Sequence, residues 1–348
     1  MDELIDKLYK EHYLNKKETV FLLTHLNKRD KEQLFQYARQ TRERFYGNKI
    51  YMRGLIEFSN VCRQNCKYCG LRSSNRKVAR YRMTKQEILS CCQKGYDLGY
   101  RTFVLQSGED PWYSIERMID IVAEIKGSFP DTALTLSIGE RSREDYQALF
   151  QAGADRYLLR HETASERLYK QLHIGMEFNN RRRCLKDLKE IGYQIGAGFM
   201  VGLPGQTAED LAEDLHYLKS IQPHMIGIGP FIPHSETPLA NAMGGTVEET
   251  LVMLALTRLF VPDCLLPATT ALGTLHEQGR ELGIKAGANV VMPNLTPVGE
   301  KAKYALYENK ICIGDEAEHC RFCIEGRIQS TGCTVDMGRG DSFRVEVR

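Results

Sequence analysis

Short apolar segments recur along the chain from about residue 49 onward. They read "IYMRGLIEF", "RTFVLQSG", "ALTLSIG", "RYLLRHET", "YQIGAGFMVG", "HMIGIGPFI", "LLPATTAL" and "ANVVMPNLT". Most are almost continuously apolar, which is typical of parallel strands that are covered on both faces. The pattern therefore predicts eight β-strands.

Segments with helical periodicity lie between these strands, for example "TKQEILSCCQKGYDLGY", "SIERMIDIVAEIKGSF", "REDYQALFQAGA" and "TAEDLAEDLHYLKSI". Two of them begin with a capping signal, because Thr84 is followed by Glu87 and Thr207 by Asp210. Repeated strand–helix alternation predicts an α/β protein with a complete (βα)8 TIM barrel. A doubly wound open sheet is the alternative, but eight units of roughly 30 residues fit a closed barrel better.

Two extensions flank the predicted barrel. Leu4, Leu8 and Tyr9 form an apolar stripe with charged residues on the opposite face, which indicates a helix. We expect N-terminal helices over residues 1–48, the barrel over residues 49–299, and a C-terminal extension over residues 300–348.

Composition narrows the class of protein. The chain has 348 residues, of which 42% are hydrophobic, and its formal net charge is +2. Because positive and negative charges nearly balance, the composition does not indicate the excess of basic residues that nucleic-acid binding requires. The N-terminus lacks the apolar region of a signal peptide, and no apolar run reaches about 18 residues. We expect a soluble cytoplasmic protein that binds neither nucleic acid nor a membrane.

Cysteine usage is unusual, with eleven cysteines in the chain. In a reducing compartment, clustered cysteines indicate metal ligands or catalysts rather than disulfides. Two clusters stand out: Cys62, Cys66 and Cys69 in "NVCRQNCKYCGL", and Cys312, Cys320 and Cys323 near the C-terminus. The other five are expected to be buried or inert thiols.

The first cluster has the spacing C-x3-C-x2-C. A zinc site would need a fourth ligand and normally shows paired C-x2-C elements. A cubane iron–sulfur cluster needs four outer ligands, so three thiolates leave one iron open. An open iron is useful where a substrate or cofactor must bind. Tyr68 places an aromatic ring beside such a cluster.

This triplet, with an aromatic residue before its third cysteine at the end of the first predicted strand, resembles the radical S-adenosylmethionine (SAM) superfamily. The stretches "EFSNVCRQNCKYCGLR", "VLQSGEDP", "GADRYLLRHETA", "GAGFMVGLPGQT", "GIGPFIPH" and "GANVVMPN" resemble the HydE-type maturases of FeFe-hydrogenase over nearly the whole chain. The resemblance implies a 4Fe–4S cluster on Cys62, Cys66 and Cys69. It also implies SAM bound at the open iron and one-electron cleavage of its sulfonium.

A cofactor-binding set follows from the same resemblance: Tyr68, Ser107, Gly108, Glu109, Ser137, Glu162 and Arg181. "SGED" departs from the double-glycine form common in the superfamily, so only its backbone contacts are carried over. Glu162 resembles the carboxylate that binds the ribose or amino end of SAM. Arg181 resembles the basic residue that pairs with the carboxylate of SAM. A surface ion pair is the alternative for both residues. No catalytic residue is assigned.

The resemblance further implies a substrate-binding set: Arg156, Arg160, Thr269, Thr270, Met292, Tyr304 and Tyr307. These would surround an anionic iron–carbonyl–cyanide–cysteine complex delivered by a partner maturase. A buried arginine needs an anion, either a ligand or a structural carboxylate, so an ion pair of Arg156 with Asp155 or Glu162 is the alternative. Tyr304 and Tyr307 are expected to share one helix face. For both tyrosines and for Met292, packing in the protein core is the alternative to substrate binding.

The second triplet matches an accessory iron–sulfur cluster, 2Fe–2S or 4Fe–4S, that some family members carry and others lack. Zinc is the alternative for Cys312, Cys320 and Cys323, because C-x2-C is also a zinc element. The spacing does not decide between an electron-transfer role and a structural role.

The expected function is reductive SAM cleavage in assembly of the diiron H-cluster of FeFe-hydrogenase. The alternatives are an enzyme like biotin synthase or methylornithine synthase acting on an amino-acid-like substrate, or a non-catalytic iron–sulfur scaffold. No further cysteines are seen at the strand ends, which counts against sulfur insertion. Expected partners are other hydrogenase maturases and an electron donor such as flavodoxin or ferredoxin.

Overall fold

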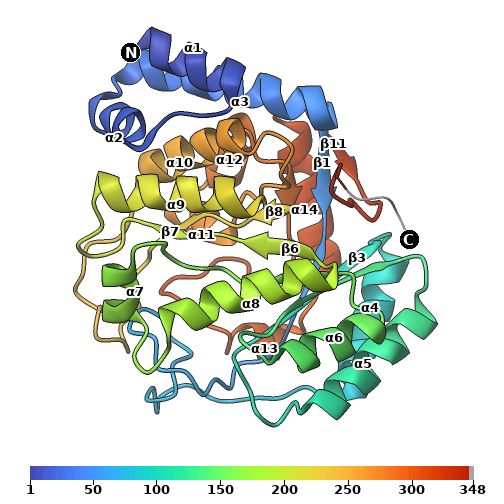
Figure 1. Cartoon of the computed structure of the whole chain (residues 1–348). Coiled ribbons are helices and arrows are strands. Elements are labelled where there is room, and N and C mark those ends of the chain that lie inside the picture. Colours follow the sequence, from blue (N-terminus) through green and yellow to red (C-terminus); the bar gives the residue numbers. More distant parts are fainter. Residues whose placement is uncertain (345–348) are drawn as a thin grey trace.

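The three-dimensional structure is a computed structural model, and it describes residues 1–344. Its first elements are the helices α1 (Asp2–Glu11), α2 (Lys16–His25) and α3 (Lys28–Tyr46). Their apolar residues face the rest of the molecule, and α3 packs against α10 (Val247–Phe260). Figure 1 shows these helices beside the end of the molecule at which the first strand begins.

Parallel strands form the ring of the barrel. The hydrogen-bonded order β2-β3-β4-β5-β6-β8 comprises Gly54–Ser59, Thr102–Ser107, Ala133–Ser137, Arg156–Leu158, Gln194–Ala197 and Met225–Ile226. Single parallel bridges join Met225 to Leu265 and Pro267 to Val290. β10 (Val290–Val291) then pairs with β1 (Lys49–Met52), which leads into β2. The predicted TIM-barrel fold is confirmed, and the open sheet is excluded.

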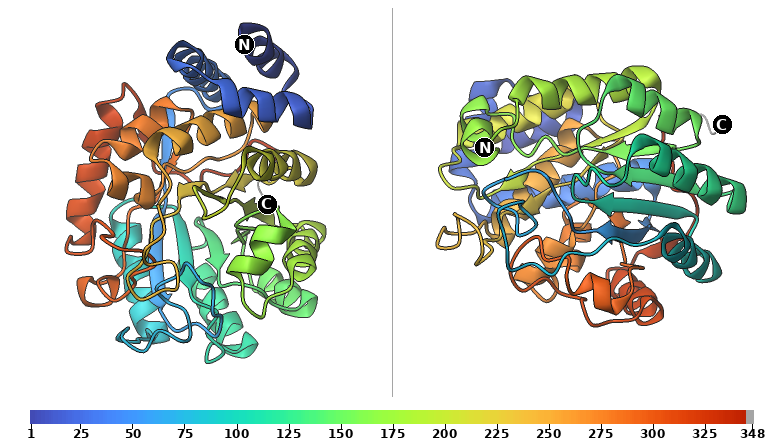
Figure 2. Two further views of the ribbon diagram at one scale, coloured as in Figure 1. Left: turned by 90° about the vertical axis from the view of Figure 1, so that its left-hand side faces the viewer. Right: turned by 90° about the horizontal axis from the view of Figure 1, so that it is seen from below.

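Helices cover the outside of the ring (Figure 2). They are α4 (Lys85–Asp97), α5 (Ile115–Ser128), α6 (Arg143–Gln151), α7 (Glu166–Leu172), α8 (Phe178–Ile191), α9 (Ala208–Ile221), α11 (Thr270–Leu275) and α12 (Gly279–Lys285), together with α10. The predicted capping boxes at Thr84 and Thr207 are both present. Among residues 1–344, no helix combines the length and the apolar character that crossing a bilayer requires.

Several strands end earlier than their apolar runs predict. "YQIGAGFMVG" divides into β6 and β7 (Met200–Val201) at Gly198, which has a φ of 149°. A Cβ atom at Gly198 would lie 1.9 Å from the carbonyl oxygen of Gly227, so two backbones touch here. "HMIGIGPFI" divides beside it, and β9 (Gly229–Pro230) pairs with β7. "LLPATTAL" contributes only the two bridges before α11 begins at Thr270.

The C-terminal part returns to the amino end of the barrel. After α13 (Val298–Lys301) and α14 (Ala317–Gln329), β11 (Thr334–Asp336) pairs with β1. Asp341 then forms a 2.6 Å ion pair with Arg156, and Gly340 accepts a hydrogen bond from Arg53 at 3.0 Å. The structure therefore does not bring Arg156 to the substrate end, where the sequence suggested it. Its anion is a structural carboxylate, Asp341 rather than Asp155 or Glu162.

Candidate active site

A cavity of about 320 Å³ lies at the carboxyl ends of the strands, and we call it the cofactor cavity. It brings together most of the residues proposed for the cofactor and several of those proposed for the substrate. These are Cys66, Tyr68, Cys69, Ser107, Ser137, Glu162 and Arg181, with Arg160, Thr269, Tyr304 and Tyr307.

The loop that carries the cysteine triplet is fixed from within. The Arg80 guanidinium donates to the carbonyl oxygens of Asn60 (2.5 Å), Leu71 (2.9 Å), Arg72 (2.8 Å) and Asn75 (3.2 Å). One side chain therefore satisfies four backbone acceptors that the irregular loop leaves free. Because of this scaffold, the loop holds its shape without regular secondary structure.

Gly108 and Glu109 hold the loop from the next strand. A Cβ atom at Gly108 would lie 2.3 Å from the Val61 carbonyl oxygen, so glycine permits the close approach. The Glu109 N–H donates to Cys62 Sγ at 3.4 Å. The Glu109 carboxylate accepts from Gln64 Nε2 (2.6 Å) and Arg63 Nε (3.2 Å), so its side chain supports the cysteine loop.

The triplet thiols are uncharged in the free protein, because burial raises the pKa of Cys66 to about 12 and raises that of Cys62 and Cys69 as well. A thiol of this kind becomes a thiolate when a metal replaces its proton. The donor set therefore fits an iron–sulfur cluster. Within residues 1–344, no three Cys, His, Asp or Glu side chains are arranged for a single metal ion.

Tyr68 is held by a histidine that sequence reasoning missed. The Tyr68 hydroxyl donates to His173 Nε2 at 3.0 Å, while His173 Nδ1 donates to the Tyr169 carbonyl oxygen at 3.1 Å. Burial lowers the pKa of His173 to about 3, so the ring is neutral at pH 7. Nothing in "QLHIGM" distinguished His173 from an ordinary buried histidine.

Glu162 lies beyond the end of β5 in the left-handed region, with a φ of 66°. This conformation costs a non-glycine residue about 1 kcal/mol. It places the Glu162 carboxylate in the cofactor cavity, where Oε2 lies 3.0 Å from an Arg160 nitrogen. Strand alternation does not explain why Arg160 and Glu162 meet, because the strand has already ended at Leu158.

Arg181, from α8, is buried in the wall of the same cavity. It donates to the carboxylate of Glu140 (2.6 Å) and to the Arg160 carbonyl oxygen (2.6 Å). This burial excludes the surface ion pair considered from the sequence. A carboxylate at Glu162 and a guanidinium at Arg181 together suit the charged ends of an amino acid.

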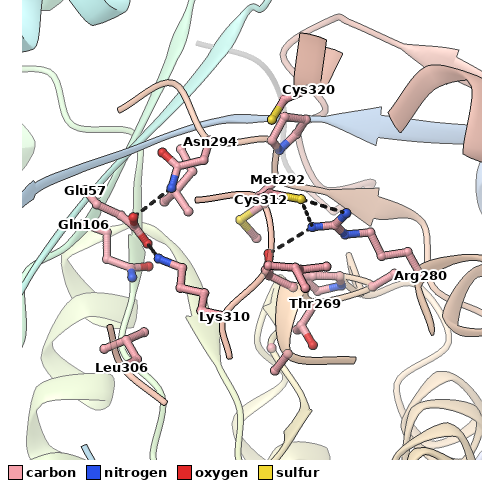
Figure 3. A pocket seen from close by; sticks show the side chains of 18 of the residues that line it. Glu57, Gln106, Thr269, Arg280, Met292, Asn294, Leu306, Lys310, Cys312 and Cys320 are labelled. Carbon is pink, nitrogen blue, oxygen red and sulfur yellow. Dashed lines mark hydrogen bonds and ion pairs between the residues drawn. The ribbon is translucent and has the colours of Figure 1, made fainter. Parts of the chain in front are cut away.

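A second cavity, the inner cavity, continues into the barrel from the first. Arg160, Thr269 and Tyr307 line both, and Thr270 and Met292 line the inner one. Figure 3 shows Glu57 in its wall, hydrogen-bonded by Asn294 (2.7 Å) and ion-paired with Lys310 (2.6 Å). The only sequence signal for Glu57 was a carboxylate inside the apolar run "LIEF".

Arg280 was also missed, and it contacts Cys312 of the second triplet in the wall of the inner cavity (Figure 3). Its guanidinium lies 3.8 Å from Cys312 Sγ and 3.4 Å from the Thr270 hydroxyl. A hydrogen bond from the Cys320 thiol lowers the pKa of Cys312, and Arg280 acts in the same direction. Cys320 and Cys323, on α14, line the same cavity, so the triplet belongs to the wall of the barrel interior.

The expected helix face shared by Tyr304 and Tyr307 is wrong, because α13 ends at Lys301 and no helix covers these tyrosines. The segment bonds to the cysteine loop instead, since the Gly70 N–H donates to the Leu306 carbonyl oxygen at 2.9 Å. Tyr304 is buried, and its hydroxyl accepts from Gln106 at 3.3 Å.

Comparison with known proteins connects this geometry to a family. The family model described as the radical SAM superfamily matches residues 56–218. The HydE subunit of the [FeFe] hydrogenase maturase of Thermotoga maritima is 49% identical over 90% of each chain. The 3-methylornithine synthase of Methanosarcina acetivorans is 29% identical over 84% of this chain and 82% of that one.

Two solved structures share the fold. A methylornithine synthase (PylB) gives a TM-score of 0.84 at 24% identity, covering 96% of this chain and 97% of that chain. The hydrogenase maturase HydG gives a TM-score of 0.80 at 21% identity, covering 96% of this chain and 75% of that chain. At these identities the structures support the fold alone. The identity to HydE, over nearly the whole of both chains, shows that this chain belongs to the radical SAM superfamily and, within it, to the HydE-type FeFe-hydrogenase maturases.

Proposed function

We propose that this protein cleaves SAM reductively and acts on a small iron–carbonyl–cyanide–cysteine complex during assembly of the FeFe-hydrogenase H-cluster. The observation that carries the proposal is that the cofactor cavity and the inner cavity adjoin each other and share lining residues. Together the two cavities extend from the cysteine triplet, past Glu162 and Arg181, to the cationic side chains that line the inner cavity.

Cys62, Cys66 and Cys69 would hold the 4Fe–4S cluster that this family uses. When bound, the cluster and SAM together supply the one-electron cleavage of a carbon–sulfur bond. The protein's part is to keep the thiols together and the loop rigid, through Arg80, Gly108 and the backbone of Glu109.

Glu162 and Arg181 are proposed to hold the amino-acid end of SAM. Glu162 supplies acceptors for an ammonium or hydroxyl group, and Arg181 still has donors beyond those that bind Glu140 and Arg160. Ser107, Ser137 and Tyr68 complete the wall beside them. These groups orient SAM and keep water from the reacting bond.

The inner cavity is proposed as the substrate site. Arg160 and Arg280 line it together with two carboxylates, Glu57 and Asp315, and Lys310 forms an ion pair with Glu57. Within residues 1–344, Arg280 forms no ion pair with a carboxylate. Its guanidinium lies 3.8 Å from Cys312 Sγ, so its charge suits an anion, either the Cys312 thiolate or a bound ligand. Thr269 and Thr270 add hydroxyl groups, Met292 and Tyr307 supply apolar and aromatic wall, and Tyr304 lies in the adjoining cofactor cavity.

An acidic electron carrier such as flavodoxin is proposed to deliver the electron. The cysteine loop and its continuation, residues 61–86, contain eight Lys and Arg residues and no Asp or Glu. This basic loop suits an acidic partner. Other hydrogenase maturases are the proposed partners for substrate delivery. We propose a cytoplasmic location, where reducing conditions would keep the eleven cysteines as the free thiols seen here.

The proposal predicts that anaerobically reconstituted protein has a 4Fe–4S electron paramagnetic resonance (EPR) spectrum that changes when SAM is added. Replacing Cys66 with Ala should abolish the spectrum and SAM cleavage. Cys264→Ala is the matched control, because Cys264 is a buried thiol outside the site. A spectrum that saturating SAM leaves unchanged would contradict SAM binding at the cluster, and would favour a scaffold.

Arg160→Met separates substrate binding from cofactor chemistry, because Met keeps an extended side chain and removes the charge. The variant should bind the cluster and cleave SAM, yet fail to mature hydrogenase in a reconstituted system. Full maturation by folded Arg160→Met would reject the substrate role. It would leave Arg160 as the structural partner of Glu162.

A further inference from the structure

A buried polar pair lies directly behind Glu162, on the side away from the cofactor cavity. His161 Nε2 donates to Asp214 Oδ1 at 3.1 Å, and both side chains are almost completely buried. His161 Nδ1 accepts from the Gly198 N–H at 3.3 Å. The ring is therefore neutral, with its proton on Nε2. The proposed chemistry uses neither residue, although a buried carboxylate is costly to maintain.

Asp214 fastens the chain on both sides of Glu162. It projects from α9, and the same Oδ1 atom that binds His161 also accepts from the Ala164 N–H at 2.5 Å. Glu162 itself donates from its N–H to the Gly198 carbonyl oxygen (3.0 Å) and accepts from the Met200 N–H (3.0 Å). The short segment 161–164 is thus fixed to α9 and to the Gly198–Met200 backbone.

This fixation explains how Glu162 keeps its left-handed φ of 66°. A non-glycine residue holds such a conformation only where its surroundings determine the backbone more strongly than its own preference does. The conformation also directs the carboxylate toward Arg160 in the cofactor cavity. If the segment relaxed to a negative φ, the side chain would leave that direction.

We propose that His161 and Asp214 are positioning residues that hold the Glu162 carboxylate in the cofactor cavity and thereby set the affinity for SAM. The inference rests on the proposed function, in which Glu162 binds SAM. It predicts that His161 acts only through Glu162, since its own side chain bonds to Asp214 and Gly198 behind the segment.

The test uses the full chain with its cluster reconstituted, and it measures the dissociation constant of SAM from the change in the EPR spectrum of the reduced cluster. His161→Phe keeps a ring and removes both hydrogen bonds. We expect roughly tenfold weaker SAM binding, the effect of about one lost buried hydrogen bond. Iron content and the spectrum without SAM should match those of the parent protein. His161→Gln retains a donor toward Asp214 and should recover part of the affinity.

Coupling to Glu162 distinguishes positioning from general damage. Glu162→Gln should weaken SAM binding in the parent protein, but have much less effect in the His161→Phe background, because the two changes remove one interaction. Tyr193→Phe is the matched control. Tyr193 lies just before β6, at the amino end of the barrel. The substitution removes the buried 2.8 Å hydrogen bond from the Tyr193 hydroxyl to the Tyr146 carbonyl oxygen, and it should leave SAM affinity unchanged.

Parent-like affinity of His161→Phe, or losses that simply add with Glu162→Gln, would overturn the positioning role. If His161→Phe does not fold, the same cycle is run with His161→Gln, whose partial loss should disappear in the Glu162→Gln background. Failure of the proposed function has a different result, since the parent spectrum itself would then not respond to SAM.

Discussion

Gly108, just after the end of β3, lies against the cysteine loop. Replacing it with Ala would place a methyl group 2.3 Å from the Val61 carbonyl oxygen and 2.7 Å from Cys62 Cβ. We expect Gly108→Ala to displace Cys62 and to lower the iron bound after reconstitution by several-fold. Iron and sulfide analysis with EPR would measure the loss.

Gly127→Ala is the control for that substitution. Gly127 lies in α5, and a Cβ atom there would meet nothing within 4 Å. Alanine is favoured over glycine in a helix by about 1 kcal/mol, so this variant should keep its iron and gain slight stability. If Gly108→Ala binds as much iron as Gly127→Ala, the contact at Gly108 is not needed for the cluster.

The sequence could indicate single residues only where a motif or a known family named them. Glu162 and Arg181 were indicated in that way, and both lie in the cofactor cavity. Arg280 carried no local signal, and Glu57 carried only that of a carboxylate inside an apolar run, because Cys312 and Lys310, which contact them, lie more than 30 positions away in the chain. Arg156 was assigned to the substrate by resemblance alone, but it is the first residue of β5 and pairs with Asp341 at the amino end of the barrel.

At the scale of helices and strands, the sequence predicted the barrel well and its carboxyl rim poorly. Apolar runs and capping boxes depend on neighbouring residues, so α4 and α9 begin where Thr84 and Thr207 indicate. The rim depends on contacts between segments, such as the backbone contact of Gly198 with Gly227. Such contacts divide the predicted strands, and the backbone of Gly198 and Met200 also bonds to Glu162.

Helix α14 allows the role of the second triplet to be tested. Cys320 and Cys323 lie on this helix, and Cys312 faces them from the preceding loop. We expect the double variant Cys312→Ala with Cys320→Ala to lose iron at this site yet keep reductive SAM cleavage, because the first triplet is unchanged. Iron content and 5′-deoxyadenosine formation would be measured together. Loss of SAM cleavage in a folded double variant would show that the second site takes part in the reaction.

At the scale of the whole molecule, the basic loop is the surface proposed to dock an acidic electron carrier. Arg76 in this loop is exposed and forms no ion pair within residues 1–344, and Lys67 lies between two of the cysteines. Arg76→Glu with Lys67→Glu should raise the KM for an acidic flavodoxin several-fold, and added salt should reduce the difference. SAM cleavage with dithionite should be unchanged, because a small reductant needs no docking surface.

Lys10→Glu, on helix α1, is the control for this charge reversal. It changes the net charge of the molecule without altering the basic loop, so its KM for flavodoxin should remain near the parent value. Equal effects from the two positions would mean that net charge, rather than the basic loop, determines association with the donor.

The contacts of the C-terminal segment with Arg53 and Arg156 close the amino end of the barrel, and they affect the order in which the chain can fold. Arg53 and Arg156 precede their contacts, Gly340 and Asp341, by 287 and 185 positions in the chain, so they are synthesised long before them. A guanidinium buried without its anion is unfavourable. During translation, the half-made barrel must therefore keep this end hydrated and open. Final closure waits until Gly340 and Asp341 have left the ribosome, so a chain stalled before them would keep the amino end of the barrel open even with most of its helices formed.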